Sequence, residues 1–224
     1  MKKLHILVPM GKEFNVIGGI TDEAVDVVTC GIGKVNAALA TAESCLRIVR
    51  PDLVMIVGCA GGLDESLRLG DVVVSSVVGY WDVWCGLAVE RGQVQGEDAK
   101  FAASRIMSDT IASILNSGLL QPGARAHIGE IVTGDTFCVD RNKVRSIHRD
   151  FPTALAVDME SAAVGQVCHK CGIPFVSIRV ISDTLNGERE EDYTRFWAEN
   201  PTSHFKFVSP LVKALAPLPL GRMR

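Results

Sequence analysis

Several features are scarce in this chain of 224 residues, and each scarcity excludes a class of protein. Lys and Arg number 23 against 26 Asp and Glu, and no long run of one sign occurs, so we expect neither nucleic acid nor an acidic membrane as a partner. No apolar stretch reaches the roughly 18 residues of a membrane span. The apolar run after Lys3 stops at Pro9, too early for a signal peptide. We therefore expect a cytoplasmic protein.

The sequence also lacks the paired cysteines of a disulfide framework or a zinc site. Its seven cysteines are odd in number and scattered, which is typical of reduced core thiols. Cys168 and Cys171 resemble half of a zinc site, but no second pair has a suitable spacing, so we expect no metal. The pair Gly31 and Gly33 lacks the third glycine of a dinucleotide fingerprint, so we expect no nicotinamide cofactor. The prediction is an absence of cofactors.

What the sequence does contain is a regular alternation of apolar runs and helical patterns. Predicted strands lie at 4–8, 24–29, 53–57, 71–78, 126–133, 155–157 and 175–181. Predicted helices lie at 34–49, 102–115, 141–150 with Asp140 as N-cap, 160–171, and 192–216 with breaks near Pro201 and Pro210. This order predicts one α/β domain over residues 1–216, a three-layer α/β/α arrangement around a central mixed sheet. The tail, 217–224, is expected to be frayed.

Two acidic residues stand where strands end. Glu160 lies at the junction of a strand and a helix, within the stretch Val157–Ala163, and Asp183 ends a later apolar strand 23 positions on. The carboxyl ends of strands line the ligand crevice in a parallel α/β sheet. Two acids brought there suggest a site that holds a polar substrate and moves a proton.

Four loops that follow strands could carry chemistry, and each also has a purely structural interpretation. Gly11 permits a turn that would present Glu13, which could equally be a surface residue. Two glycines in the turn 31–33 could bind an anion with backbone N–H groups or pack closely on the sheet. The small residues 58–62 would let the backbone approach a ligand, and Phe137 could stack on a heterocycle or belong to the core. The charged cluster 188–192 is expected to be a solvated loop and helix start.

In this order and spacing the loops resemble the 5′-methylthioadenosine/S-adenosylhomocysteine nucleosidases of the purine nucleoside phosphorylase superfamily. Seven short motifs carry the resemblance over nearly the whole chain: 10–13, 31–35, 58–62, 70–74, 133–137, 157–163 and 181–183. The family implies a homodimeric hydrolase that splits the N-glycosidic bond between adenine and a 5′-thio-substituted ribose. Its ligand is a small purine nucleoside.

The resemblance also implies roles for individual residues. Asp183 is similar to the acid that protonates adenine N7, Glu13 to the base that activates water, and Glu160 to the group that binds the ribose hydroxyls. Phe137 would stack on the purine, and the backbone of Cys138 would read the adenine edge. Tyr193 and Phe196 match aromatics around the 5′-thio group. The remaining substrate-binding positions are Met10, Cys59, Ala60, Gly61, Asp158, Met159 and Ser182.

An acid that donates a proton near neutral pH needs a raised pKa. Arg179 lies four residues before Asp183 on the same strand, hence on the same face, and would lower that pKa if it pointed at Asp183. We therefore predict that Arg179 pairs elsewhere, with Asp158 as its partner.

The sequence departs from the family in three places, and the first and third lie where the family forms its dimer and closes the pocket for the 5′ substituent. The region between Glu13 and the second strand is about twenty residues shorter than in a typical member, Cys59 replaces a serine, and the segment 80–86 brings Trp81 and Trp84 to a pocket or an interface. Three alternatives stay open: a hydrolase of futalosine or another purine nucleoside, a phosphate-dependent phosphorylase, and a nucleoside-binding protein without activity. Lys12 and Glu13 stand where a phosphorylase needs an arginine, which favours water over phosphate.

Overall fold

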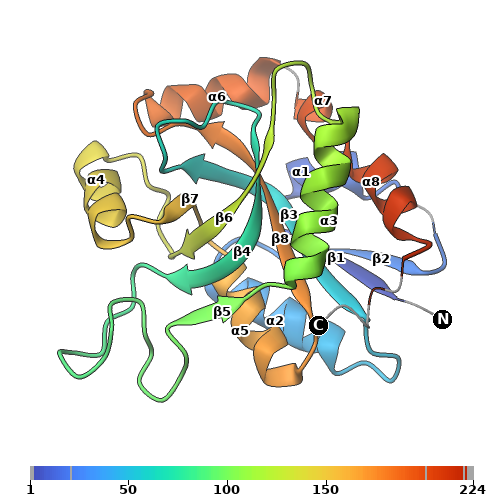
Figure 1. Ribbon diagram of the computed structural model, residues 1–224, viewed down its shortest axis with the longest axis horizontal. Helices are drawn as coiled ribbons and strands as arrows, with labels where there is room; N and C mark the ends of the chain where they lie inside the picture. Colours follow the sequence, from blue (N-terminus) through green and yellow to red (C-terminus); the bar gives the residue numbers. More distant parts are fainter. Residues whose placement is uncertain (1–2, 21, 200, 219, 221–224) are drawn as a thin grey trace.

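The computed structural model describes residues 3–20, 22–199, 201–218 and 220. Its strands are β1 Leu4–Val8, β2 Val25–Thr29, β3 Leu53–Gly62, β4 Val72–Tyr80, β5 Lys100–Ala102, β6 Ala126–Thr133, β7 Ala154–Asp158 and β8 Phe175–Asp183. Its helices are α1 Gly11–Ile17, α2 Lys34–Cys45, α3 Arg105–Ile114 with a looser turn at Leu115–Leu119, α4 Arg141–Asp150, α5 Ser161–Cys171, α6 Arg189–Glu199, α7 Pro201–Phe205 and α8 Val208–Leu215. Figure 1 shows the strands at the centre with helices around them.

The eight strands form one mixed sheet in the order β2-β1-β3-β7-β6-β4-β5, with β8 paired to both β3 and β4. Strands β2, β1, β3 and β8 run parallel, and β4, β6 and β7 run parallel in the opposite direction. Because β8 joins β3 to β4, the five strands β3, β7, β6, β4 and β8 close into a ring. The sheet is therefore strongly curled at the place where β3 meets β7.

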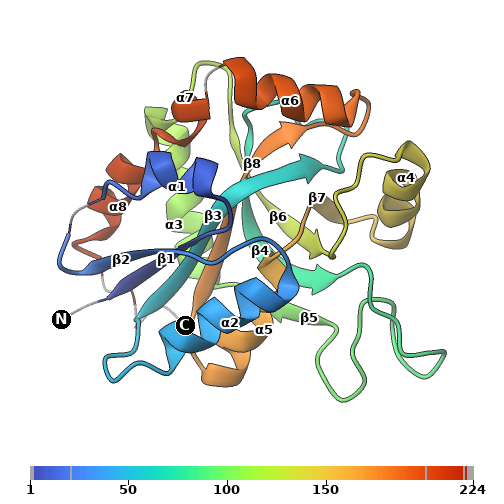
Figure 2. The same ribbon diagram turned by 180° about the vertical axis from the view of Figure 1, so that it is seen from behind.

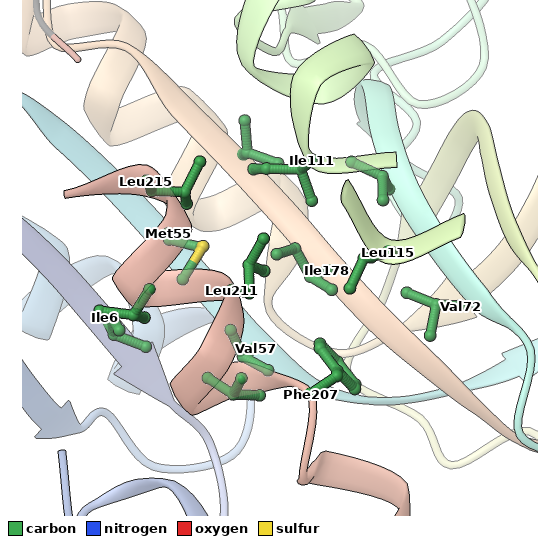
Figure 3. Close-up of a cluster of buried hydrophobic side chains, with 14 of the residues drawn as sticks. Ile6, Met55, Val57, Val72, Ile111, Leu115, Ile178, Phe207, Leu211 and Leu215 are labelled. Atoms are coloured by element: carbon green, nitrogen blue, oxygen red, sulfur yellow. The ribbon is translucent and has the colours of Figure 1, made fainter. Parts of the chain in front are cut away.

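Helices cover both faces of the sheet, because side chains alternate between faces along each strand. One face packs Ile6, Met55, Val57, Val72 and Ile178 against apolar residues of α3 and α8, and Figure 3 shows the interdigitated side chains. The other face packs against the small residues of α2 and α5, which Figure 2 shows lying together. The predicted α/β class with a central mixed sheet is confirmed.

Most predicted elements are found within a few residues of their expected bounds. The strands at 4–8 and 126–133 and the helix at 141–150 match fully, and the Asp140 side chain accepts the N–H groups of Asn142 and Lys143 as an N-cap should. The prediction missed α1 and β5. It also ended β3 too early, since that strand continues through the glycines to Gly62.

The C-terminal helices correct two further expectations. The second break falls at residues 206–207, and Pro210 lies inside the first turn of α8, where a missing N–H costs no helical hydrogen bond. Leu220 is buried in the core beside partly buried Leu218, so these tail residues are not frayed, whereas 219 and 221–224 lie outside the described residues. Within the parts of the chain that the structure describes, no helix is long and apolar enough to cross a membrane.

Candidate active site

A cavity of about 330 Å³ lies at the carboxyl ends of β1, β3, β7 and β8. All of the predicted site residues except Phe196 line it: Met10, Glu13, Cys59, Ala60, Gly61, Phe137, Cys138, Asp158, Met159, Glu160, Ser182, Asp183 and Tyr193. Residues from distant parts of the chain thus meet in one hollow.

The acids of β7 and β8 meet for a different topological reason from the one expected. The two strands are not neighbours in a parallel sheet. Instead, β7 pairs antiparallel with β3 at Gly61–Val157 and Gly62–Ala156, and β8 runs parallel beside β3. The ends of β3 and β7 therefore point toward each other where the sheet curls, which brings Glu160 and Asp183 to the same cavity.

Glu13 is buried, with 1% of its surface exposed, and both of its carboxyl oxygens accept backbone N–H groups. Its position in the first turn of α1 lets Oε2 accept the Met10 N–H at 3.0 Å, while Oε1 accepts the Cys59 N–H at 2.7 Å. Burial raises the pKa of Glu13, opposed by Arg179 and by these two N–H groups. Each oxygen retains lone-pair capacity, so a water in the cavity could donate a hydrogen bond to it.

Arg179 is fully buried and lies between the carboxylates of Asp158 and Glu160. Its Nη2 atom is 2.8 Å from Asp158 Oδ2 and 3.3 Å from Glu160 Oε2. The prediction that Arg179 pairs with Asp158 is confirmed. Asp158 also accepts the Thr133 hydroxyl at 2.5 Å and the Ser161 hydroxyl, so it is held on several sides.

Glu160 precedes α5 and reaches the glycine turn before α2. Its Oε1 accepts the Gly33 N–H at 2.9 Å. Burial raises its pKa to about 7 despite the opposing charge of Arg179, and the Asp158 carboxylate raises it further. The N-terminus of α2 is thus occupied by the protein's own carboxylates, since Lys34 N–H also donates to Asp135 at 2.8 Å. Of the two interpretations of the turn 31–33, anion binding is therefore the correct one, but the anions are carboxylate side chains of the protein itself.

The glycine-rich segment at the end of β3 makes room for charged side chains of the protein itself. A Cβ atom on Gly58 would lie 2.7 Å from Arg179 Nη1 and 2.9 Å from Glu13 Oε1. A Cβ atom on Gly61 would overlap the guanidinium of Arg189 and lie 2.7 Å from Asp183 Oδ1. Glycine at both positions is therefore required for the charged groups to reach the cavity.

Asp183 ends β8 with 2% of its surface exposed. Burial raises its pKa, opposed by Arg189 and by the hydroxyl of Ser182, which donates to Oδ2 at 2.9 Å. Arg189 Nη2 lies 2.7 Å from Asp183 Oδ1. Sequence reasoning missed this residue because it placed the cluster 188–192 in solvent. That expectation is wrong for Arg189 and Asp192, which are both buried.

Aromatic side chains form one wall of the cavity. The rings of Phe137 and Tyr193 lie edge to face with centroids 5.0 Å apart, and the Tyr193 hydroxyl is 3.5 Å from Met10 Sδ. Phe137 remains 46% exposed, so its face is accessible to a flat ligand. Phe196 does not line the cavity: it is buried in the core and its ring stacks on His204, which corrects its predicted place near the 5′ group.

Two of the departures from the family, Cys59 and the tryptophans of segment 80–86, lie in different hollows of the structure. The Cys59 thiol lines the cavity next to Glu13, and burial raises its pKa well above the usual value, so it stays a neutral thiol. Trp81 and Trp84 line a second hollow of about 290 Å³ rather than the cavity with the acids. Trp81 also lies against Gly134, where a Cβ atom would be 2.5 Å from its ring.

The cavity contains three buried carboxyl groups with raised pKa values, those of Glu13, Asp183 and Glu160, of which Glu160 lies beside Arg179. A raised pKa suits a group that gives or takes a proton near neutral pH. Among the described residues, no cluster of His, Cys, Asp and Glu has the arrangement of a metal site.

Comparisons with known proteins agree on one family. A family model for the phosphorylase superfamily matches residues 3–213. A 5′-methylthioadenosine/S-adenosylhomocysteine nucleosidase of Staphylococcus aureus is 35% identical over 199 residues, which cover 88% of this chain and 85% of that protein.

Solved structures give the same result for the fold. The chain is similar to the nucleosidase of that kind from Neisseria meningitidis in complex with methylthio-immucillin-A, with a TM-score of 0.84, 29% identity and coverage of 96% of this chain and 100% of the other. It is also similar to the one from Colwellia psychrerythraea in complex with adenine, with a TM-score of 0.81, 32% identity and coverage of 94% and 95%.

Proposed function

The chain belongs to the phosphorylase superfamily, in its family of 5′-methylthioadenosine/S-adenosylhomocysteine nucleosidases, and we propose that it hydrolyses the N-glycosidic bond of such 5′-thio-substituted adenine nucleosides. The products are adenine and a thioribose. The observation that carries the proposal is the meeting of Glu13, Glu160 and Asp183 in one cavity beside the accessible ring of Phe137.

Each acid has a separate task in this reaction. Asp183 donates a proton to purine N7 as the bond between the sugar and N9 breaks, because adenine leaves poorly as an anion. Such general acid catalysis is worth about 10²–10⁴-fold. Glu13 takes a proton from the attacking water, and Glu160 binds the ribose hydroxyls. The carboxylates also stabilise the positive charge that develops on the ribose.

Two features of the cavity favour water over phosphate as the nucleophile. Glu13, in the first turn of α1 just after β1, lines the cavity, and a carboxylate repels phosphate. Among the lining residues that the structure describes, the cations are Arg179 and Arg189, and each is paired with a carboxylate. Phosphate would have to compete with Asp158, Glu160 or Asp183 for either guanidinium.

The purine would lie between Phe137 and the segment at the end of β3, with its edge toward the backbone of Cys138. The 5′-thio group would lie toward Met10 and Tyr193, whose hydroxyl and sulfur atoms are already in contact. The thioether of Met10 and the ring of Tyr193 carry no charge, which favours an uncharged substituent such as a methylthio group.

We further infer that two copies of the chain pair through the face of α2 that carries Val35 and Leu39. These side chains are 78% and 60% exposed, and neighbouring Ile32, 49% exposed, lines the cavity. An exposed apolar stripe beside a site is typical of an interface. Sedimentation of Val35→Glu/Leu39→Glu, with Ile106→Glu on α3 as the control, tests this: we expect the double variant alone to be monomeric. A monomeric unmodified protein would contradict it.

The free state of all seven cysteines supports a reducing, cytoplasmic location, which we also propose.

Incubation in phosphate-free buffer with methylthioadenosine, S-adenosylhomocysteine, adenosine, inosine and futalosine, followed by chromatography of the released base, tests the activity. We expect adenine from the two thio-nucleosides. Hypoxanthine from futalosine alone would change the substrate, and release of base only after phosphate is added would make the chain a phosphorylase.

A further inference from the structure

Arg189 is a buried cation at one end of the cavity that the reaction proposed above does not use. Its guanidinium joins three separate segments: Nη2 lies 2.7 Å from Asp183 Oδ1, Nε donates to the Cys138 carbonyl at 2.7 Å, and Nη1 donates to the Gly62 carbonyl at 2.9 Å. The side chains of Arg189 and Asp183 are each 2% exposed. Three charge-assisted contacts of this length fix both the guanidinium and the carboxylate.

The place of Arg189 is built into the fold rather than filled by chance. It is the first residue of α6, so its three contacts hold this helix against the ends of β3 and β8. Gly61 provides the space, because a Cβ atom there would overlap the guanidinium. The two groups that the purine is proposed to contact, the Asp183 carboxyl and the Cys138 backbone, are therefore both bonded to Arg189.

Several ionisable groups surround Asp183, and they shift its pKa in opposite directions. Besides the Ser182 hydroxyl on its own strand, it faces these ionisable groups: Arg189, Asp192 and Tyr193 from α6, Cys59 from β3 and Cys138 from the loop after β6. Burial and Asp192 raise the pKa of Asp183, and Arg189 is the stronger of the two groups that lower it. Arg189 is the only cation in this set, so among these groups it is the one that most opposes protonation of Asp183.

We propose that Arg189 is a positioning residue that keeps the Asp183 carboxylate charged and in place until a purine binds. When the purine binds, it replaces the guanidinium as the partner of this carboxyl group, and Asp183 takes up a proton. The inference rests on the proposed function. The proton comes from the bulk solvent and its buffer and passes from Asp183 to purine N7 as the N-glycosidic bond breaks, while the electron pair of that bond leaves with N9. Glu13 later releases to the solvent the proton that it takes from the attacking water, so the reaction balances. Binding of the purine is thus coupled directly to protonation of Asp183.

Titration calorimetry with 9-methyladenine as the probe tests the coupling without turnover, because substitution at N9 leaves N7 without a proton, as in a nucleoside. Measured at neutral pH in buffers of different ionisation enthalpy, binding to the unmodified protein should take up about one proton per molecule of this base. In Arg189→Met, where Asp183 is already more protonated, we expect an uptake at least twofold smaller. Arg105→Met is the control, since Arg105 lies on α3 outside the cavity with its side chain 93% exposed.

The outcomes separate this inference from the proposed function. Binding of 9-methyladenine with no proton uptake by the unmodified protein would overturn the role of Arg189 even if the variant failed to fold. Equal uptake in Arg189→Met and the unmodified protein would do the same. No binding of 9-methyladenine or of adenine would overturn the proposed adenine site itself.

The pH profile of kcat/KM provides a second test, because a purely structural role of Arg189 would not shift this profile along the pH axis. Activity needs protonated Asp183, so it falls as pH rises through the pKa of this group in the free enzyme. Without the guanidinium that pKa is higher, and we expect the falling limb in Arg189→Met to move up by about one pH unit. Arg189→Lys, which keeps the charge, should restore most of the original profile. A uniform loss of kcat/KM at every pH would contradict the proposal.

Discussion

Arg179 and Asp158 form an ion pair that is closed to solvent, with 2.8 Å between Nη2 and Oδ2 and 1% of each side chain exposed. The same guanidinium lies 3.3 Å from Glu160 and also reaches Ser161 and Ser177 through Nε, at 3.2 Å from each hydroxyl. Breaking a buried pair by removing one partner leaves an uncompensated charge and typically costs about 3–5 kcal/mol. Arg179 therefore links Asp158, Glu160 and the two serines beneath the cavity.

From this arrangement we expect Arg179→Met to lower the free energy of unfolding by about 3–5 kcal/mol. Urea unfolding followed by circular dichroism measures the change. Arg149→Met is the control, because Arg149 pairs with Asp150 while 74% of its side chain is exposed, and we expect it to change stability by less than about 1 kcal/mol. Equal effects of the two substitutions would contradict the role given to Arg179.

Glu13→Gln should lower kcat by about 10²–10⁴-fold, since an amide cannot accept the proton of the attacking water. The fold should survive, because the amide oxygen can still accept one of the two N–H groups that Glu13 binds. Steady-state kinetics with Glu65→Gln, an exposed glutamate, as the control checks this. Near wild-type turnover in Glu13→Gln would remove Glu13 from the mechanism.

Asp183→Asn should cause a comparable loss of kcat with adenine nucleosides, because asparagine cannot protonate N7. Asp109→Asn on the surface of α3 is the matched control, with the Asp109 side chain 59% exposed. A nucleoside whose leaving group needs no protonation should be spared in Asp183→Asn. Equal losses for both kinds of leaving group would show that Asp183 is not the acid.

Glu160 gives a prediction for the dependence of stability on pH. Its pKa is about 7 in the folded protein against 4.5 ordinarily, so between these values the folded protein binds more protons than the unfolded chain. Its contribution to stability is therefore fully present below about pH 4.5 and is lost as pH rises through 7. We expect this component of the slope to be absent in Glu160→Gln, with stability measured by urea unfolding at half-unit steps of pH. The same slope in both proteins would contradict the shifted pKa.

Glu160→Gln should also raise KM and lower kcat, since the ribose loses a charged acceptor. If the variant unfolds instead, Glu160 is a structural partner of Arg179 and Gly33 and not a binding residue.

Phe137→Ala should raise KM by roughly 2–10-fold, because an aromatic stacking contact contributes about 0.5–1.5 kcal/mol. Phe137→Tyr keeps the ring and should leave KM close to its original value. Competition by adenine measures the same contact without turnover, and an unchanged affinity in Phe137→Ala would place the purine elsewhere.

The sequence predicted the α/β class, most strands and the pairing of Arg179 with Asp158, because these follow from local periodicity and from the need to keep a cation away from an acid. It predicted that the acids of β7 and β8 meet, but through a parallel sheet, and only the long-range pairing of β7 with β3 reveals the actual cause. The ion pair of Arg189 with Asp183 was beyond reach, since nothing local marks one residue of a charged cluster as buried. The predicted position of Phe196 was wrong for a similar reason, because an aromatic residue in a helix can face either the cavity or the core.

The measurement that tests the central claim most directly is turnover of methylthioadenosine in ¹⁸O-labelled water without phosphate, with mass analysis of both products. We expect one ¹⁸O atom in the released thioribose, none in adenine, and no change in rate when phosphate is added. A sugar phosphate without label, formed only when phosphate is present, would contradict hydrolysis and the role of Glu13 in activating water.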